Sequence, residues 1–344
     1  MNQDNSNHSP DGVVDVAIIG AGPTGLFAAF YAGLRHMSVL LMDSLDTLGG
    51  QLATLYPEKY IYDVAGFPKV LAKDLAKSLS DQALQFNPIV RLGEQALKLD
   101  RPGQKQPFVI GTGKGTYHAR SVIITGGIGA FTPKRLPISE PDSYLGRGLY
   151  YFVQDLRSLH GRRVLIVGGG DSAVDWANML APHAAEITLI HRRDQFRAHE
   201  DSVKKMRQST VKIRTPYELK SVMGNSRIES AVIFDNKTRK EEQLEIEALL
   251  VNIGFESALG PIAEWGLELE GGQIIVDPMM QTSRAGIFAA GDIATFPGKL
   301  KLIATGFGEA AIAVNYAKHY LDPTANIFPG HSTALKGMGQ AAVK

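Results

Sequence analysis

The sequence predicts an α/β fold in which one strand–turn–helix–strand unit occurs twice. Three observations support this prediction. The pattern first runs from Val16 to Asp43, it returns from Val164 to Arg193, and the chain of 344 residues is long enough for two domains with substantial cores. We therefore expect two α/β domains, each built around one copy of the unit.

The first unit opens with a buried strand and a glycine-rich turn. Four apolar residues, Val16 to Ile19, form the strand, and Gly20, Gly22 and Gly25 follow with the spacing G-x-G-x-x-G. Pro23 falls in the first turn of the next helix, where proline is accepted. These glycines allow a tight turn, close approach of a pyrophosphate and close helix packing, and the helix N-terminus favours phosphate. The pattern indicates a Rossmann-like, dinucleotide-binding domain.

An acid at the end of the second strand completes the first unit. Asp43 follows the apolar strand Ser38 to Met42, where a carboxylate can accept hydrogen bonds from a ribose without a phosphate. Two alternatives are open. The turn could be a glycine-rich turn that binds nothing, or the uncharged stretch Val16 to Leu34 could span a bilayer. Its interior glycines and proline argue against the span.

The second unit repeats the glycines but not the acid. It has Gly168 and Gly170, with Ala173 in the third position, and His191 stands where the first unit has Asp43. The basic residues that follow are Arg192, Arg193 and Arg197. Arginine forks bind a 2′-phosphate that an acid would repel, so the pattern favours NADP at this site. The alternative is an exposed basic loop without a ligand.

Composition limits the chemistry. The net charge of +1 gives no reason to expect nucleic acid as a partner, and no metal site is expected. Cysteine is absent, so redox chemistry must reside on a bound cofactor rather than on a thiol. The polar residues 1–12 are expected to be disordered, and no charged and apolar leader of the signal-peptide type opens the chain.

Between the motifs, apolar periodicity predicts one helix at Leu71 to Phe86 and another at Thr305 to Tyr320. A linker is expected at Pro133 to Pro141. Expected strands of the first domain are Leu92 to Leu99, Phe108 to Gly111, Tyr117 to His118 and Ser121 to Thr125. Those of the second are Lys212 to Ile213, Leu219 to Met223, Ile228 to Phe234 and Glu241 to Glu245, forming a meander, and Leu249 to Ile253.

Gly291 and Asp292 end a further strand, just before the helix at Thr305 to Tyr320. The Asp292 carboxylate could accept hydrogen bonds from the hydroxyls of a flavin's ribityl chain. It could equally cap the helix that follows.

Taken together, these motifs resemble the flavoprotein family of bacterial thioredoxin reductase over essentially the whole chain. The markers are GAGPTG, GGGDSA, Gly49-Gly50-Gln51, the run from His191 to Ala198, and Gly291-Asp292. The resemblance implies an FAD-binding domain interrupted in sequence by an NADPH-binding domain. The chain departs from the family pattern where its Cys-x-x-Cys pair would lie, because Phe152 and Asp155 occupy those positions. Disulfide reduction is therefore excluded.

The chain is more similar to the thioredoxin-reductase-like type of ferredoxin–NADP reductase, which lacks the cysteine pair and carries an additional C-terminal tail. The segments Gly49 to Leu52, Leu55 to Asp63 and Phe328 to Thr333 carry this resemblance. It implies a cytoplasmic, homodimeric electron-transfer enzyme that moves hydride between NADPH and FAD and single electrons between FAD and ferredoxin. Tyr56 would stack on one face of the flavin, and the tail with His331 would cover the other face from the partner subunit.

The resemblance also implies domain bounds and contacts. The FAD-binding domain would comprise 13–131 and 257–326, the NADP-binding domain 132–256, and the tail 327–344. The implied FAD contacts are Gly20, Gly22, Thr24, Gly25, Asp43, Gly50, Gln51, Tyr56, Ala96, Phe131, Asp292 and Thr333. The implied NADP contacts are Gly168, Gly170, Asp171, Ser172, Ala173, His191, Arg192, Arg193 and Arg197.

The electron acceptor is less closely defined. Because ferredoxins are acidic, Lys299 and Lys301 are expected at the docking surface, with Lys134 and Arg135 as weaker candidates. Alternatives are a reductase of flavodoxin, quinones or ferric chelates, an NADPH oxidase, and a redox sensor without turnover.

Overall fold

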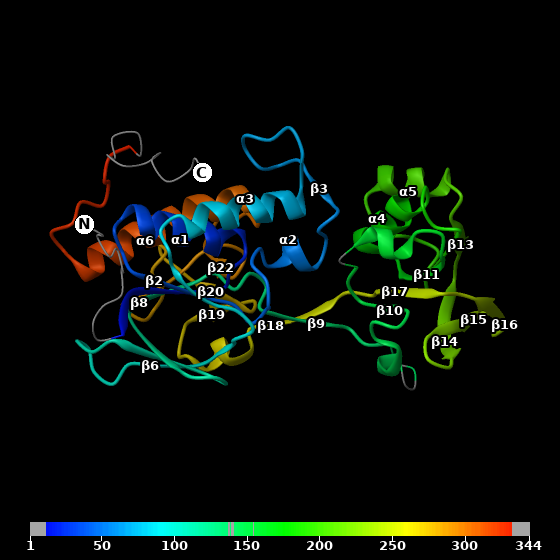
Figure 1. Cartoon of the computed structure of the whole chain (residues 1–344), viewed down its shortest axis with the longest axis horizontal. Helices are drawn as coiled ribbons and strands as arrows, with labels where there is room; N and C mark the ends of the chain where they lie inside the picture. Colours follow the sequence, from blue (N-terminus) through cyan, green and yellow to red (C-terminus); the bar gives the residue numbers. More distant parts are fainter. Residues whose placement is uncertain (1–11, 137, 139–140, 154, 332–344) are drawn as a thin grey trace, which may run out of the picture. The chain divides into compact units, whose positions relative to one another are not determined.

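The computed structural model describes residues 12–136, 138, 141–153 and 155–331. The chain divides into two compact units, which are described separately. Unit 1 combines the residues up to Ala130 with those from Ser257 onward, and unit 2 spans Phe131–Glu256. The chain crosses between the units twice, through β9 (Ala130–Pro133) and β18 (Phe255–Ala258), which pair with each other (Figure 1).

Unit 1 is built on a seven-stranded sheet. Its path is β5 (Ile89–Arg91), β2 (Val39–Met42), β1 (Val13–Ile19), β8 (Thr116–Ile124), β7 (Phe108–Thr112) and β6 (Ala96–Asp100), and β21 (Ile287–Ala289) also pairs with β8. The strands β5, β2, β1, β8 and β21 are parallel, whereas β7 runs antiparallel to β8, and β6 runs antiparallel to β7. Parallel strands place their carboxyl ends at one edge, so β1, β2, β8 and β21 all deliver their following loops there.

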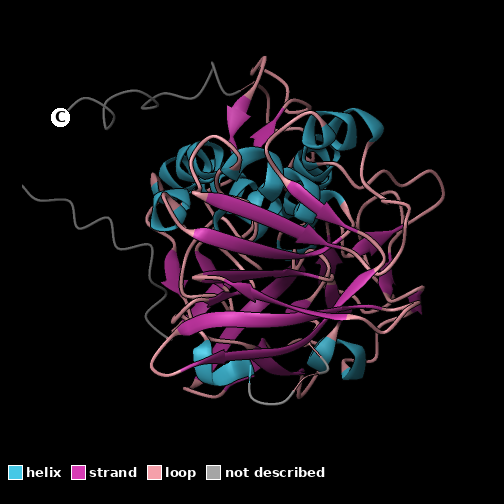
Figure 2. Cartoon of the chain, turned by 90° about the vertical axis from the view of Figure 1, so that its right-hand side faces the viewer, coloured by secondary structure: helices cyan, strands magenta, loops and turns pink. Residues whose placement is uncertain are grey.

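Three helices of unit 1 pack side by side over this sheet (Figure 1), and Figure 2 shows the helices of the chain in cyan and its strands in magenta. They are α1 (Pro23–Leu34), α3 (Ala72–Leu84) and α6 (Ile303–Leu321). The buried face of α1 consists of small residues and Leu26, which permits close packing. At Gly33, an added Cβ would lie 2.3 Å from the Phe86 ring, so only glycine fits there.

Smaller elements complete unit 1. The short helix α2 (Gln51–Thr54) begins directly after Gly50, and the short helix η3 is Gly260–Glu264. A hairpin joins β3 (Tyr60–Ile61) to β4 (Val70–Leu71), and a small sheet contains β19 (Leu269–Glu270), β20 (Gln273–Ile275) and β22 (Ala294–Thr295). The two strands expected at Tyr117 and at Ser121 are one continuous strand, β8, which pairs with β7 from Thr116 to Ala119 and with β1 from His118 to Ile124.

Unit 2 contains a five-stranded parallel sheet. Its order is β10 (Leu149–Tyr150), β17 (Ala248–Asn252), β11 (Arg163–Gly168), β12 (Glu186–Ile190) and β13 (Lys212–Arg214). The helices are α4 (Asp171–Leu180), α5 (Glu200–Arg207), η1 (Pro141–Tyr144) and η2 (Leu156–Leu159). The antiparallel meander is β14 (Tyr217–Gly224), β15 (Ile228–Asp235) and β16 (Glu241–Glu245).

One strand assignment was wrong. Lys212 and Ile213, expected in the meander, belong to β13 at the edge of the parallel sheet, where Ile213 pairs with Leu189. The α/β class with two Rossmann-like units is confirmed. Among the described residues, no helix combines the length and the apolar character needed to cross a lipid bilayer.

Candidate dinucleotide sites

The first glycine loop is closed by tight backbone packing. Gly20 has φ +113°, and a Cβ atom added to it would lie 2.4 Å from the Thr125 carbonyl oxygen. A Cβ atom added to Gly25 would lie 1.8 Å from the Gly20 carbonyl oxygen. No side chain fits at either glycine. The Thr125 hydroxyl donates a hydrogen bond to that same Gly20 oxygen at 2.7 Å, which fixes the loop to the end of β8.

Gly22 is the open position of the loop. It caps the N-terminus of α1 without a side-chain hydrogen bond, and nothing lies within 4 Å of its ideal Cβ position. The first N–H groups of α1 are therefore approachable through the space beside Gly22. This is the arrangement that a pyrophosphate needs at a helix N-terminus.

Asp43 holds two loops at the edge of the sheet. One carboxylate oxygen accepts the Ala21 N–H at 2.6 Å, and the other accepts the Leu45 N–H at 2.9 Å. Burial raises the pKa of Asp43, and these backbone hydrogen bonds oppose the rise. Each oxygen retains a second lone pair, so a ribose hydroxyl can still donate to the carboxylate.

The segment around Gly50 lies against the first glycine loop. The Gly49 N–H donates to the Ala21 carbonyl oxygen at 2.9 Å, and the Cβ position of Gly50 is 2.8 Å from the Gly22 Cα. Gln51 begins α2, and its Nε2 lies 3.2 Å from the Cβ position of Gly127, in the loop after β8. The structure therefore brings Gly50 and Gln51 to the same edge as Gly22.

Thr24 and Gly291 connect this edge to the end of β21. Gly291 has φ +81°, and its Cβ position lies 2.8 Å from the Thr24 Oγ1. The Cβ position of Gly306, in the first turns of α6, lies 2.4 Å from the same oxygen. Since α6 is capped by Leu302, Asp292 does not cap that helix. The helix-cap alternative for Asp292 is therefore excluded.

Tyr56 is electrostatically coupled to Asp292. Burial, together with the smaller effect of the negative charges of Asp292 and Asp63, raises the pKa of the Tyr56 hydroxyl to about 12. The ring is partly buried against the core of unit 1. An aromatic ring and an acid that are far apart in sequence thus lie close enough to interact at one edge of the sheet.

The remaining residues predicted to contact the first cofactor lie in different parts of the chain. Ala96 is buried at the start of β6. Phe131 lies in β9, and its side chain is outside the part of the chain that the structure describes. Thr333 also lies outside the described residues. His331 is exposed, and its ring makes an edge contact with Phe328 at 5.5 Å.

The second glycine loop repeats this geometry in unit 2. The Cβ position of Gly168 lies 2.4 Å from the Asn252 carbonyl oxygen and 2.9 Å from the Ala173 Cβ, so the strand end, the helix and β17 are closely packed. Gly170 caps α4, and nothing lies within 4 Å of its Cβ position. The N-terminus of α4 is therefore as open as that of α1.

The basic segment after β12 is tied to this loop. The Arg197 N–H donates to the Gly169 carbonyl oxygen at 2.8 Å, and Asp171 accepts the His199 N–H at 3.0 Å. Gly169, which the motif spacing does not require, has its Cβ position 2.3 Å from the His191 ring. Only glycine therefore allows His191 to lie against the loop.

The charges of the segment are unbalanced. Arg192, Arg193 and Arg197 are exposed, and within the described ranges none of their guanidinium groups has an ion-pair partner. Burial lowers the pKa of His191, and although a hydrogen bond with the Gln195 carbonyl opposes this, the three arginine charges lower it further. The geometry suits an added phosphate, which would supply the missing negative charge.

One expected surface residue is buried instead. The side chain of Lys299 is only 6% exposed and forms an ion pair with Glu309, so its assignment to a docking surface was wrong. A lysine in a polar loop looks exposed in sequence, and nothing local reveals its partner ten positions on. Lys301 is exposed.

Comparison with known proteins identifies the family. Residues 14–315 match the model of the pyridine nucleotide-disulphide oxidoreductases, and the chain belongs to that family. A ferredoxin–NADP reductase of Halalkalibacterium halodurans is 54% identical over 322 residues, which cover 93% of this chain and 97% of that protein. A ferredoxin–NADP reductase of Thermus thermophilus is 53% identical over 330 residues, covering 94% of this chain and 98% of that protein.

The solved structures agree with the fold. A thioredoxin reductase of T. acidophilum superposes with a TM-score of 0.75 at 26% identity, covering 91% of this chain and all of that one. A Lactococcus lactis thioredoxin reductase gives a TM-score of 0.74 at 26% identity, over 90% of this chain and 99% of that chain. The resemblance recognised from the sequence motifs is confirmed.

Proposed function

We propose that this chain is a ferredoxin–NADP reductase that holds FAD in unit 1 and NADPH in unit 2. The observation that carries the proposal is the contrast between the two units: the first has Asp43 at the end of its second strand, whereas the second has three arginines that form no ion pair with any described residue. This contrast supports one ribose without a phosphate and one with a 2′-phosphate. When bound, the flavin accepts a hydride from NADPH and releases electrons singly to a one-electron carrier.

The residues of unit 1 bind and orient the first cofactor. The open N-terminus of α1 beside Gly22 would hold the pyrophosphate, and Asp43 would accept from the ribose. Asp292 would accept from the ribityl hydroxyls, and the Tyr56 ring would cover one face of the flavin. Contacts from Gln51, Ala96, Phe131 and Thr333 are part of the same proposal.

The residues of unit 2 bind and select the second cofactor. Gly170 leaves the N-terminus of α4 open for the pyrophosphate, while Arg192, Arg193 and Arg197 would bind the 2′-phosphate. Asp171 acts indirectly, because its hydrogen bond to the His199 N–H keeps the basic segment against the loop. The enzyme is expected to prefer NADPH over NADH.

The acceptor is proposed to be ferredoxin or a related carrier. The chain has no cysteine, so electrons cannot leave through a dithiol. Lys301 is the exposed basic candidate near Asp292 in sequence, and it supports docking of an acidic partner. The proposal includes a cytoplasmic homodimer, in which the exposed apolar residues Ile327 and Phe328 lead a tail to the partner subunit.

The test is NADPH-driven reduction of cytochrome c by the purified yellow protein, with and without ferredoxin. Strong dependence on ferredoxin is expected, since the flavin should reduce cytochrome c slowly without it. Rapid flavin reduction without ferredoxin-dependent turnover would reject ferredoxin as acceptor and favour a quinone, flavodoxin or ferric reductase or an oxidase. A flavin that NADPH fails to reduce would indicate a sensor.

A further inference from the structure

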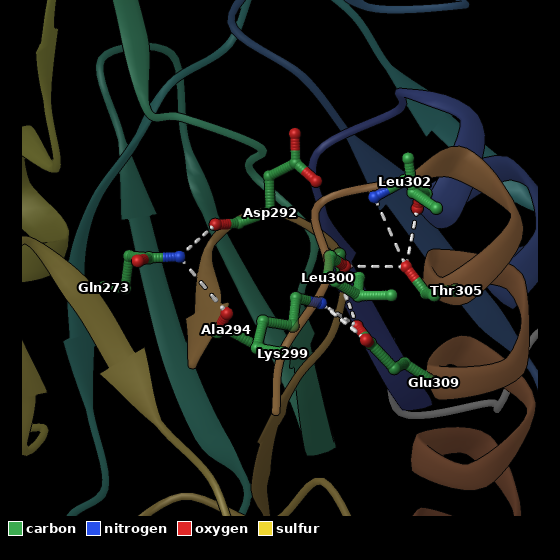
Figure 3. Close-up of polar contacts among 9 residues, drawn as sticks. Gln273, Asp292, Ala294, Lys299, Leu300, Leu302, Thr305 and Glu309 are labelled. Carbon is green, nitrogen blue, oxygen red and sulfur yellow. Dashed lines mark hydrogen bonds and ion pairs between the residues drawn. The ribbon is translucent and has the colours of Figure 1, made fainter. Parts of the chain in front are cut away.

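The ion pair between Lys299 and Glu309 is unusual in its burial (Figure 3). The two side chains are 6% and 7% exposed. In every other ion pair found among the described residues, both side chains are at least 20% exposed. The Lys299 Nζ lies 2.5 Å from both oxygens of the Glu309 carboxylate.

Glu309 has a second donor in the backbone next to Asp292. Its Oε2 accepts the Gly291 N–H at 2.8 Å. The carboxylate therefore joins α6, the segment that carries Lys299, and the end of β21. Because Gly291 also packs against the Thr24 hydroxyl, the junction extends to the first turn of α1.

Side-chain hydrogen bonds also hold the backbone next to Asp292 and Lys299. The Gln273 side chain donates from Nε2 to the Asp292 carbonyl oxygen at 2.7 Å and to the Ala294 carbonyl oxygen at 3.3 Å. The Thr305 hydroxyl donates to the Leu300 and Leu302 carbonyl oxygens at 2.8 and 2.9 Å. In Figure 3 the Asp292 carboxylate points away from the ion pair, so its oxygens are not consumed by the junction.

Stability alone does not account for a buried pair of this kind. Removing two charges from water is costly, and apolar residues of similar volume often stabilise a fold equally well or better. What an ion pair adds is direction, since the carboxylate must face both the ammonium group and the Gly291 N–H. The pair thus specifies where the backbone before Asp292 lies.

We propose that Lys299 and Glu309 are positioning residues that hold Asp292 and the first turn of α6 in the geometry required to bind the flavin. They act through Asp292 and do not contact the cofactor themselves. This proposal rests on the assignment of FAD to unit 1.

The test is a double-mutant cycle on FAD binding to the apoprotein, measured by flavin fluorescence. We expect Lys299→Met and Asp292→Ala each to weaken binding by about tenfold or more. If Lys299 acts through Asp292, the double variant should bind no more weakly than Asp292→Ala alone, because coupled residues are not additive. Lys77→Met is the matched control, because it removes an exposed ion pair with Asp81, and it should bind FAD as the parent protein does.

A second readout separates positioning from loss of fold. The variant Lys299→Met/Glu309→Gln leaves no buried charge without a partner, and it serves if the single variant does not fold. Its apoprotein should unfold at a temperature close to that of the parent but bind FAD more weakly. Parental FAD affinity in Lys299→Met, or strict additivity with Asp292→Ala, would overturn the proposal. If the parent protein binds no FAD, the proposed function fails first.

Discussion

Replacing Gly22 by alanine should separate cofactor binding from folding. Gly22 has φ −73° and ψ −175°, which alanine adopts without strain, and nothing lies within 4 Å of its Cβ position. Alanine is a poorer N-cap than glycine, whereas loss of glycine reduces the entropy of the unfolded chain. These effects oppose each other, so the apoprotein should change in stability by less than about 1 kcal/mol.

The same methyl group should obstruct the cofactor. It would project into the space through which a pyrophosphate approaches the first N–H groups of α1. Each tenfold loss of affinity corresponds to about 1.4 kcal/mol, and exclusion of the phosphate from even one of these hydrogen bonds to a charged group costs roughly 1.5–3 kcal/mol. Gly22→Ala should therefore weaken FAD binding by about one to two orders of magnitude.

The assay is FAD titration of the apoprotein by fluorescence, combined with thermal unfolding. Gly113→Ala is the matched control, because its Cβ position is also open but lies in an exposed turn. Gly25→Ala is the opposite control, since a Cβ 1.8 Å from the Gly20 oxygen must destabilise the fold. Gly170→Ala should weaken NADPH binding and leave FAD bound. The reasoning is refuted if Gly22→Ala binds FAD as tightly as Gly113→Ala does.

Three further predictions concern charge. Arg192→Ala/Arg193→Ala should raise KM for NADPH about tenfold or more with little effect on NADH, and an unchanged ratio of the two would reject the 2′-phosphate site. Because the pKa of His191 is lowered in the folded chain, the unfolded chain takes up the proton first as pH falls, so stability should decrease below the ordinary value of 6.5. A bound 2′-phosphate should raise this pKa again, so NADPH should bind more tightly toward low pH. In a binding titration, His191→Gln should abolish that trend. The pKa of Tyr56 is raised from 10.0 to about 12 in the folded chain, so the unfolded chain loses this proton first and stability should fall as pH rises through that range. In denaturant titrations, Tyr56→Phe should show a smaller fall.

The parts of the sites that sequence predicted are those set by local spacing. Gly20, Gly22 and Gly25 lie between the end of β1 and the first turn of α1, and their contacts follow from the geometry of a strand that runs directly into a helix. The position of Asp43 follows for the same reason, because β1 and β2 are adjacent parallel strands whose carboxyl ends meet. Such relations need no knowledge of the rest of the chain.

Sequence could not reveal contacts made by tertiary packing. The coupling of Tyr56 to Asp292 joins a loop after α2 to the end of β21, which no spacing rule relates. Lys299 looked exposed because its partner Glu309 is visible only once the preceding segment folds against α6. Lys212 was assigned to the meander since a three-residue edge strand carries too little periodicity to show its sheet.

One of the two positions that hold the redox cysteines in the thioredoxin reductase pattern, Asp155, has a structural role here. Asp155 caps η2, where its carboxylate accepts the Arg157 N–H at 2.9 Å, and its carbonyl oxygen accepts the Ser158 hydroxyl at 2.7 Å. A carboxylate in this position stabilises the turn but cannot carry electrons. The chain has no cysteine and therefore no thiol relay, so under the proposed function electrons would leave from the bound flavin itself. Under the proposed function, both dinucleotide loops would serve an acceptor other than a disulfide of the chain itself, because a helix cap stands where the family pattern has a cysteine.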